Sequence, residues 1–247
     1  MNKFIWKYKD HNTDDINNIS EQFLVPKSIA SIMSLRGINN KKISRSFFYH
    51  DLDKLYDPLL MLDMDKAIHR IIYAKNNGQL ILIVGDYDAD GTLGASILYL
   101  YFKSLDIDIE YYIPNRQTEG YGVSNTAVDY AKKIGAELII TCDCGITAID
   151  QVMYAKNYNI DVIITDHHKQ QEKLPEAHAI LNPNRLECNY PFKGLCGAGV
   201  AFKLCIGVNN ELEHDLESVL CYSDLAAVAT TADMVPIIDE NRLIIKE

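Results

Sequence analysis

The spacing of apolar residues changes at residue 80. Before that point, apolar side chains recur at helical intervals, most clearly over residues 29–35 and 65–77, and Gly37 and Gly78 follow these stretches as stop signals. After it, short uninterrupted apolar runs alternate with helical stretches of roughly ten residues. The runs cover residues 80–84, 107–113, 138–141 and 162–165, and the helical stretches cover residues 93–105, 125–134, 148–157, 198–206 and 216–231.

This alternation predicts an α/β fold in which a parallel β-sheet is flanked by helices, because uninterrupted apolar runs are typical of strands that are buried on both faces. We therefore expect two parts, a helical N-terminal leader over residues 1–79 and a sheet-containing domain over residues 80–247.

Three of the expected strands end in acidic segments. The first runs into Asp86, Asp88 and Asp90, the third runs into Asp143, and the fourth runs into residues 166–168, which read Asp-His-His. Open parallel sheets bind ligands outside the carboxyl ends of their strands. The fold is therefore expected to bring five aspartates and two histidines toward one crevice.

Carboxylates packed this closely repel one another, so either their pKa values rise or a cation neutralises them. Oxygen-rich ligation with one or two imidazoles suits Mn²⁺ or Mg²⁺ better than zinc in a thiolate site. Several carboxylates able to bridge suggest two ions, an arrangement that promotes in-line displacement at phosphorus.

Each acidic residue also has a simpler explanation, since an aspartate after a strand is often only the N-cap of the next helix. Three such strand ends together favour a site over three separate caps. Adjacent His167 and His168 point in different directions if the chain is extended there. We therefore expect only one of them to bind metal and the other to face substrate or core.

A rival interpretation concerns Asp88 and Asp90. An apolar strand followed by residues 88–93, Asp-Ala-Asp-Gly-Thr-Leu, resembles the nucleophile motif of haloacid-dehalogenase-like phosphatases. In that case Asp88 would be phosphorylated and Asp90 would act as acid and base. That chemistry requires neither Asp86 nor an Asp-His-His segment at a later strand.

Charge and cysteine content bear on the partner and the compartment. The net charge is −10, which is not typical of a general binder of phosphate backbones, so a nucleic-acid function must depend on local features. No signal-peptide pattern and no apolar run of membrane-spanning length are visible. The six cysteines include no CxxC pair, and we expect reduced thiols in a cytoplasmic protein.

Taken in order, residues 85–91, the Asp143 segment and residues 166–168 resemble motifs I to III of the DHH phosphoesterase superfamily, and Asp233 within residues 226–236 resembles motif IV. Within that superfamily the chain is most similar to the RecJ family of single-stranded-DNA exonucleases. The similarity covers nearly the whole chain. The supporting segments are residues 113–116 (Ile-Pro-Asn-Arg), 119–122 (Glu-Gly-Tyr-Gly), 181–184 (Leu-Asn-Pro-Asn) and 197–202 (Gly-Ala-Gly-Val-Ala-Phe), with 36–38 (Arg-Gly-Ile) and 57–58 (Asp-Pro) in the leader.

The resemblance implies a role for each candidate residue. Asp90, Asp143, His167 and Asp233 would hold one Mn²⁺, while Asp86 and Asp88, with Asp143 bridging, would hold a second. His168 would contact the scissile phosphate, and Asp166 would orient His167. Asn115, Arg116 and Arg185 are implied substrate contacts. Gly197 and Gly199 allow either a helix N-terminus close to a phosphate or simple helix packing.

The same resemblance implies a fold and an activity, namely the DHH phosphoesterase fold and stepwise hydrolysis of single-stranded DNA from its 5′ end in DNA repair and recombination. Members of the family continue into a second subdomain and a nucleic-acid-binding barrel, whereas this sequence stops soon after Asp233. We expect a catalytic part whose basic strand-binding surface lies elsewhere and which is weakly active alone. Two alternatives stay open: an enzyme for small or short-oligonucleotide substrates, and a non-catalytic scaffold of the same fold.

Overall fold

The structure is a computed structural model that describes residues 5, 7, 9, 10, 12–48 and 52–247. It divides into two compact units, residues 1–52 and 53–247. Within the described residues, no helix is both long enough and apolar enough to cross a membrane.

The first unit contains three short helices, α1 (Thr13–Phe23), α2 (Lys27–Leu35) and α3 (Lys41–Phe48). The Asn12 side chain caps α1 by accepting a hydrogen bond from the backbone of Asp14. Gly37, with φ +71°, lets the chain turn after α2, as its position in the sequence predicted. The buried core of this unit is Ile16, Ile19, Ala30, Met33 and Ile38, with Phe23, Val25 and Phe47 packed against it.

The second unit is built on a parallel sheet with strand order β2-β1-β3-β4-β5. Its strands are β1 (Ile81–Gly85), β2 (Ile109–Tyr112), β3 (Leu138–Cys142), β4 (Asp161–Thr165) and β5 (Ala179–Leu181). Its helices are η2 (Pro58–Leu60), α4 (Met64–Asn76), α5 (Ala89–Ser104), α6 (Asn125–Ile134), α7 (Ile149–Lys156), α8 (Gly197–Glu211), α9 (Glu217–Leu220), α10 (Ser223–Ala232) and α11 (Asp239–Lys246), and η1 (Leu52–Lys54) lies at the junction of the two units.

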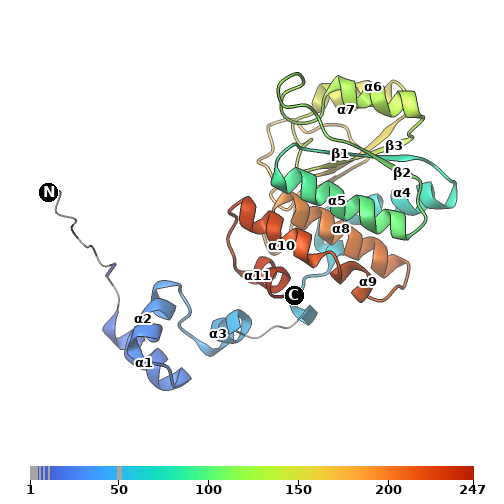
Figure 1. The fold of residues 1–247 in the computed structure, drawn as a ribbon. Coiled ribbons are helices and arrows are strands. Elements are labelled where there is room, and N and C mark those ends of the chain that lie inside the picture. Colours follow the sequence, from blue (N-terminus) through green and yellow to red (C-terminus); the bar gives the residue numbers. More distant parts are fainter. Residues whose placement is uncertain (1–4, 6, 8, 11, 49–51) are drawn as a thin grey trace. The chain divides into compact units, whose positions relative to one another are not determined.

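Helices cover both faces of this sheet (Figure 1). On one face, α6 and α7 bury a cluster that includes Leu82, Ile139 and Ile164 of three neighbouring strands. On the other face lie α4, α5 and α8, and α10 packs on the outside of α5 and α8. The predicted α/β architecture with a parallel sheet is confirmed.

The sequence-based boundaries need several adjustments. Helix α4 lies in the compact unit that starts at Asp53 rather than in a leader ending at residue 79, because its buried side chains, including Ala67 and Ile71, pack against α8 and β5. The stretch expected as one helix over residues 216–231 is divided between α9 and α10. Strand β5 and helix α11 were not anticipated.

A buried ionic cluster joins α8 to α11. The Nζ of Lys203, which is fully buried, donates to Oε1 of Glu240 at 2.8 Å and also to the backbone oxygen of Tyr56. Glu240 accepts two more hydrogen bonds, from the Tyr190 hydroxyl at 2.6 Å and from the Tyr56 amide at 2.8 Å. Burial lowers the pKa of Lys203, and the adjacent Glu240 carboxylate opposes that shift. Both charges are therefore buried with hydrogen-bond partners.

Candidate metal centre

The parallel register aligns the acidic residues in one row. Gly85, Cys142, Thr165 and Leu181 are register partners across four strands. The residues that follow β1, β3 and β4 continue the hydrogen-bonded ladder. The amide of Asp86 donates to Cys142 O (3.2 Å), the amide of Asp143 donates to Thr165 O (2.9 Å), and the amide of Asp166 donates to Leu181 O (3.0 Å). The row expected from the strand ends therefore exists, at the carboxyl edge of the sheet.

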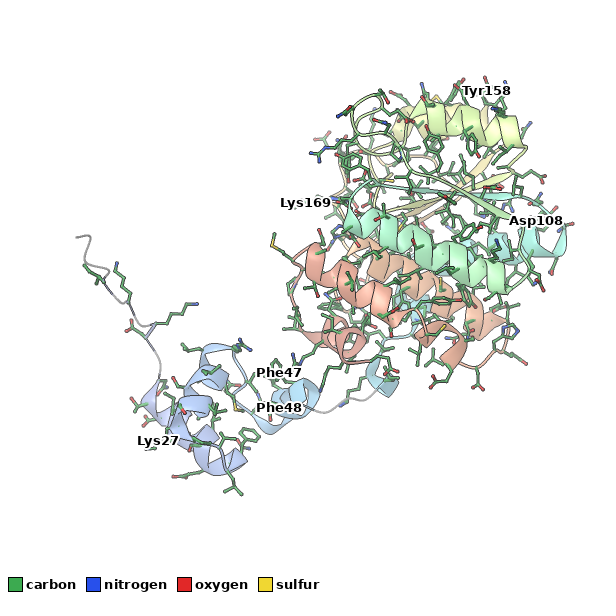
Figure 2. All side chains as sticks on the ribbon, viewed as in Figure 1. Lys27, Phe47, Phe48, Asp108, Tyr158 and Lys169 are labelled. Atoms are coloured by element: carbon green, nitrogen blue, oxygen red, sulfur yellow. The ribbon has the colours of Figure 1, made fainter. Side chains whose placement is uncertain are left out.

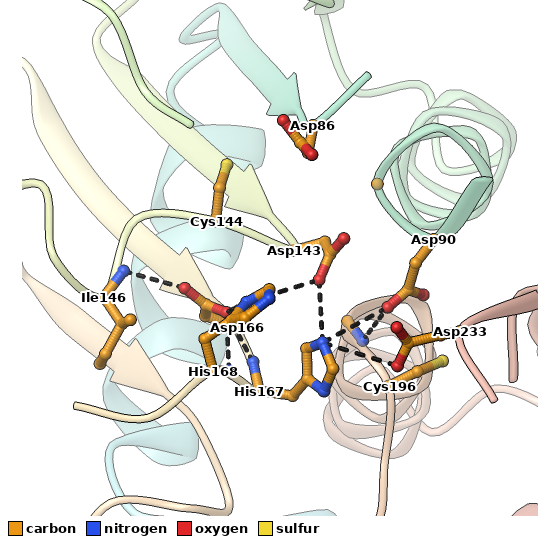
Figure 3. A network of polar contacts seen from close by, with 12 residues as sticks. Asp86, Asp90, Asp143, Cys144, Ile146, Asp166, His167, His168, Cys196 and Asp233 are labelled. Carbon is orange, nitrogen blue, oxygen red and sulfur yellow. Dashed lines mark hydrogen bonds and ion pairs between the residues drawn. The ribbon is translucent and has the colours of Figure 1, made fainter. Parts of the chain in front are cut away.

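His167 is the centre of the first group of candidate metal ligands. Its Nε2 lies 3.1 Å from Oδ1 of Asp143, 3.7 Å from Oδ2 of Asp90 and 3.8 Å from Oδ2 of Asp233 (Figure 3). These residues come from the ends of β3 and β4, the first turn of α5 and the C-cap of α10. Four residues that are far apart in sequence thus meet around one small volume.

Asp86, Asp88 and Asp143 form a second group, whose carboxylate oxygens lie within 4.8 Å of one another. The Asp88 side chain also caps α5, since its Oδ1 accepts a hydrogen bond from the Gly91 amide at 3.0 Å. The simple N-cap explanation is therefore correct for one oxygen of Asp88. Asp143 belongs to both groups of ligands, and it adopts φ +60°, a left-handed conformation that is uncommon for a residue other than glycine.

Several buried polar atoms in these groups have no hydrogen-bond partner. Among the described residues, five buried side-chain polar atoms lack one, and three of them are Asp86 Oδ2, Asp143 Oδ1 and His167 Nε2. Buried polar groups in proteins are normally satisfied, and unsatisfied atoms clustered together indicate an absent ligand. Two oxygens and one imidazole nitrogen are the donor types that Mn²⁺ and Mg²⁺ accept, so these residues fit a divalent cation.

Asp90 is held by the start of α8. Its two carboxylate oxygens accept hydrogen bonds from the amides of Gly197 (2.6 Å) and Ala198 (2.8 Å). The anion at this helix N-terminus is therefore a side chain of the protein itself. A Cβ atom added to Gly197 would lie 2.5 Å from the Asp143 Cβ and 2.7 Å from its Cα, so a glycine is needed for this approach.

The partner of Asp166 differs from the one expected. Its Oδ1 lies 2.8 Å from Nδ1 of His168, and it reaches His167 only through the backbone amide, at 2.7 Å. Its Oδ2 accepts from the amide of Ile146 at 2.9 Å. The expectation that Asp166 orients the His167 ring is therefore wrong: its carboxylate orients the His168 ring and fixes the backbone of both histidines.

Three residues that hold the histidine loop had been assigned no role from the sequence. Asn182 donates to His168 O at 2.8 Å, and Asn184 donates to His167 O at 2.6 Å. The Tyr121 hydroxyl lies 3.3 Å from the Asp143 carbonyl oxygen and 3.3 Å from each ring nitrogen of His168. The sequence features that could have indicated these roles are the Asn-Pro-Asn segment, which contains Asn182 and Asn184, and the Glu-Gly-Tyr-Gly segment, which contains Tyr121.

The three expected substrate contacts have different surroundings. Arg116 is exposed, and its guanidinium lies 5.1 Å from the centre of the Tyr87 ring. Asn115 is exposed and uses its side-chain oxygen to accept from the Gln117 amide. The guanidinium of Arg185 instead is largely buried, forms a 2.6 Å ion pair with Asp63 and donates to Ile180 O.

Crowding of the acids changes their titration. Burial raises the pKa of Asp143 to about 7, and the nearby Asp90 and Asp88 charges act in the same direction, against an opposing effect of His167. The hydrogen bond to Asp166 raises the pKa of His168 to about 9. Burial lowers the pKa of His167, but the adjacent Asp143 carboxylate outweighs it and the net shift is upward. Burial raises the pKa of Asp86 and of Asp233.

Several known proteins have sequences related to this chain. The RecJ single-stranded-DNA-specific exonuclease of Bacillus subtilis is 40% identical over 242 residues, 98% of this chain and 30% of that protein. The RecJ of Escherichia coli is 39% identical over 191 residues, 73% of this chain and 33% of that protein. The chain thus spans about a third of the length of these relatives.

Among solved structures, RecJ exonucleases also match this chain. A RecJ exonuclease bound to manganese matches with a TM-score of 0.70 and 34% identity, covering 75% of this chain and 47% of that one. RecJ of Thermus thermophilus in complex with Mn²⁺ matches with a TM-score of 0.77 and 27% identity, covering 95% of this chain and 33% of that one. The model of the DHH family N-terminal domain matches residues 80–230. The acidic row and its histidines therefore lie in a DHH domain, and the chain belongs to the DHH family.

Proposed function

We propose that this chain is the catalytic part of a RecJ-like, metal-dependent exonuclease that hydrolyses single-stranded DNA from the 5′ end, with roles in DNA repair and recombination. The observation that carries the proposal is the convergence of Asp90, Asp143, His167 and Asp233, with buried ligand atoms that lack hydrogen-bond partners. RecJ relatives act on single-stranded DNA and have been crystallised with Mn²⁺ or Mg²⁺, which supports the substrate and the metal.

Two cations fit the two groups of ligands in this proposal. Asp90, Asp143, His167 and Asp233 would hold one, and Asp86, Asp88 and Asp143 would hold the other. Mn²⁺ is the preferred ion, because it accepts the His167 imidazole more readily than Mg²⁺ does; Mg²⁺ is the alternative, because carboxylate oxygens suit both ions. Divalent cations held there would supply Lewis-acid activation of water and neutralisation of charge at phosphorus.

The residues around these ligands would orient the substrate. His168 is 45% exposed, and in the metal-free chain its hydrogen bond with Asp166 raises its pKa to about 9, which favours a cationic ring that can contact a scissile phosphate. Asp166 keeps that ring protonated and oriented. Arg116, which lies over Tyr87, and Asn115 would contact a neighbouring nucleotide from the loop after β2. The free thiols of all six cysteines agree with action in the reducing cytoplasm.

The test is hydrolysis of 5′-phosphorylated single-stranded DNA in Mn²⁺, with metal stoichiometry measured by titration calorimetry. Asp143→Ala removes a ligand common to both groups, so we expect loss of activity of at least about a thousandfold and weaker Mn²⁺ binding. The matched control is Asp150→Ala, an exposed aspartate in the first turn of α7, which should retain full activity. Full activity in Asp143→Ala rejects the assignment.

Substrate comparison separates the alternatives. The proposal expects the chain to cleave long single strands into mononucleotides at least as well as it cleaves dinucleotides. A strong preference for dinucleotides would instead indicate a short-oligonucleotide phosphodiesterase of the same family. A trapped phosphoaspartate at Asp88 would indicate dehalogenase-like chemistry. Tight Mn²⁺ binding without hydrolysis of any of these substrates would indicate a non-catalytic scaffold.

A further inference from the structure

Charge is divided unequally between the two compact units. Residues 1–52 contain eight Lys and Arg against five Asp and Glu, a net charge of +3. Residues 53–247 contain sixteen against twenty-nine, a net charge of −13. The net negative charge of the unit with the candidate metal ligands therefore repels a polyanion before it reaches those residues. A DNA substrate then needs a source of electrostatic attraction in another part of the protein.

The positive charge of the first unit is concentrated in one stretch, residues 27–48, which we call the α2–α3 segment. Its 22 residues contain five basic side chains and no acidic one. The acidic residues of the same unit that lie in a described helix, Asp14, Asp15 and Glu21, belong to α1. The basic residues of the segment are Lys27, Arg36, Lys41, Lys42 and Arg45.

Packing in the first unit buries part of the apolar surface of this segment, whereas Ile29, Ile32, Leu35 and Ile43 are 41–49% exposed. Ala30, Met33 and Ile38 are buried in its core. Lys27 at the start of α2 and Arg36 after its end are exposed, and the turn between the helices carries exposed Asn39 and Asn40. The other three basic residues lie on α3. Exposed cationic and amide side chains therefore lie at both ends of α2 and in the turn before α3, and the sequence adds three more cations on α3. This composition is typical of sites that bind phosphate backbones.

An aromatic side chain accompanies these charges. Phe48, at the end of α3, is 50% exposed and stands edge-on to Phe47, which packs against the core (Figure 2). Proteins that bind single strands without sequence preference combine basic side chains with aromatic rings on which bases stack. An exposed ring on the helix whose sequence carries these cations favours a single strand over a partner that offers only negative charge.

We propose that the α2–α3 segment binds the phosphate backbone of single-stranded DNA and supplies the attraction that the acidic unit lacks. The identity of the nucleic acid rests on the proposed function. The binding itself requires no metal and no hydrolysis, so it can be tested separately. An anionic membrane surface is the competing partner, and the same variants distinguish the two.

The experiment measures fluorescence anisotropy of a labelled oligothymidylate with the whole chain in EDTA, over a range of salt concentrations. The triple variant Lys41→Gln/Lys42→Gln/Arg45→Gln should bind at least about tenfold more weakly at low salt, with a slope of log affinity against log salt shallower by up to about 2. Glutamine keeps the helix propensity of the residues it replaces. Thermal melting verifies that the variant folds.

The matched control removes the same charge from the acidic unit. Lys132→Gln/Lys133→Gln/Lys156→Gln changes three lysines of α6 and α7, and it should leave affinity and slope near the wild-type values. A second variant, Lys27→Gln/Arg36→Gln, tests the other part of the segment if the first folds poorly, and it should also weaken binding. Lys41→Arg/Lys42→Arg keeps the charge and should bind as the wild type does.

Three results would overturn the inference. One is unchanged affinity and slope in both the triple and the double glutamine variants. Another is an equal loss in the α6–α7 control, which would attribute the effect to net charge alone. The third is binding to phosphatidylserine vesicles, sensitive to the same variants, without binding to the oligothymidylate. The outcome is independent of the nuclease assay, because binding is measured in EDTA, where no metal is bound and no hydrolysis takes place.

Discussion

Lys203–Glu240 and Asp143–His167 are both buried acid–base pairs, but they differ in how their remaining polar atoms are satisfied. The Glu240 carboxylate accepts hydrogen bonds from Lys203, Tyr56 and Tyr190. In the second pair, Asp143 Oδ1 and His167 Nε2 lie 3.1 Å apart, yet neither has a hydrogen-bond partner. The first pair is complete within the chain, whereas the second becomes complete only with a ligand. Buried charge therefore supports structure at one place and ligand binding at the other.

The largest effect should come from breaking the complete pair. Lys203→Met leaves the Glu240 charge buried without its cation, and we expect the free energy of unfolding to fall by about 3–5 kcal/mol in urea denaturation. The double variant Lys203→Met/Glu240→Leu removes both charges and should recover most of that loss. A single variant that loses less than about 1 kcal/mol would mean that the cluster contributes little to stability.

A smaller effect is expected from crowding the incomplete site. Gly197→Ala puts a methyl group against the backbone of Asp143, which cannot move aside, so we expect a loss of about 1–3 kcal/mol in stability. Mn²⁺ affinity should fall by about 10- to 100-fold, as it does when the supports of metal ligands are displaced. Titration calorimetry measures the affinity.

Gly199→Ala is the matched control, because an added Cβ there would make an ordinary 3.4 Å contact with the Leu195 side chain. It lies on the same turn of α8 and should leave Mn²⁺ affinity near the wild-type value. Equal losses in the two variants would show that the effect comes from the helix and not from the contact with Asp143.

The smallest effect concerns pH. The folded-state pKa of Asp143 is about 7 and that of His168 about 9, both above their ordinary values, and the pKa of His167 is also raised. Protonation of these groups therefore stabilises the metal-free chain. This stabilisation is fully present below about pH 4 and is lost as the pH rises through about 7 to 9, and we expect a decline of about 1–2 kcal/mol between pH 5 and 8.

Mn²⁺ should reverse this trend, because it binds the deprotonated ligands and must displace those protons. Denaturation midpoints in EDTA and in Mn²⁺ at the two pH values measure both effects. Asp143→Asn should flatten the decline in EDTA. Stabilisation by Mn²⁺ that does not increase with pH would contradict the assignment of these groups as ligands.

The sequence was sufficient for the sheet and for the convergence of most of the candidate metal ligands. Apolar runs identify four of the strands, and the acidic residues that follow three of them must converge if the strands are parallel. Asp233 lies after a helix, so no periodicity places it at the sheet edge, and only the resemblance to known motifs indicated its role.

Features that depend on distant pairings were not predictable. Strand β5 has only three residues, too few for a period to be visible. The partner of Arg185 is Asp63, which precedes it by 122 residues, so the sequence could not indicate that this arginine is already paired. Asp166 has His167 and His168 equally near in sequence, and side-chain orientation alone decides which ring it contacts.

The row formed by Asp86, Asp143 and Asp166 has a consequence for assembly of the molecule. Each residue stands one position beyond a register partner, so a slip of a single residue in β1, β3 or β4 would turn a candidate ligand, or the carboxylate that orients His168, to the opposite face of the sheet. Chains that fold with such a slip would lack the group of candidate ligands altogether, and would not keep a site of lower metal affinity. Metal uptake would then report that the sheet has formed correctly, and it would favour that state among competing misfolded ones.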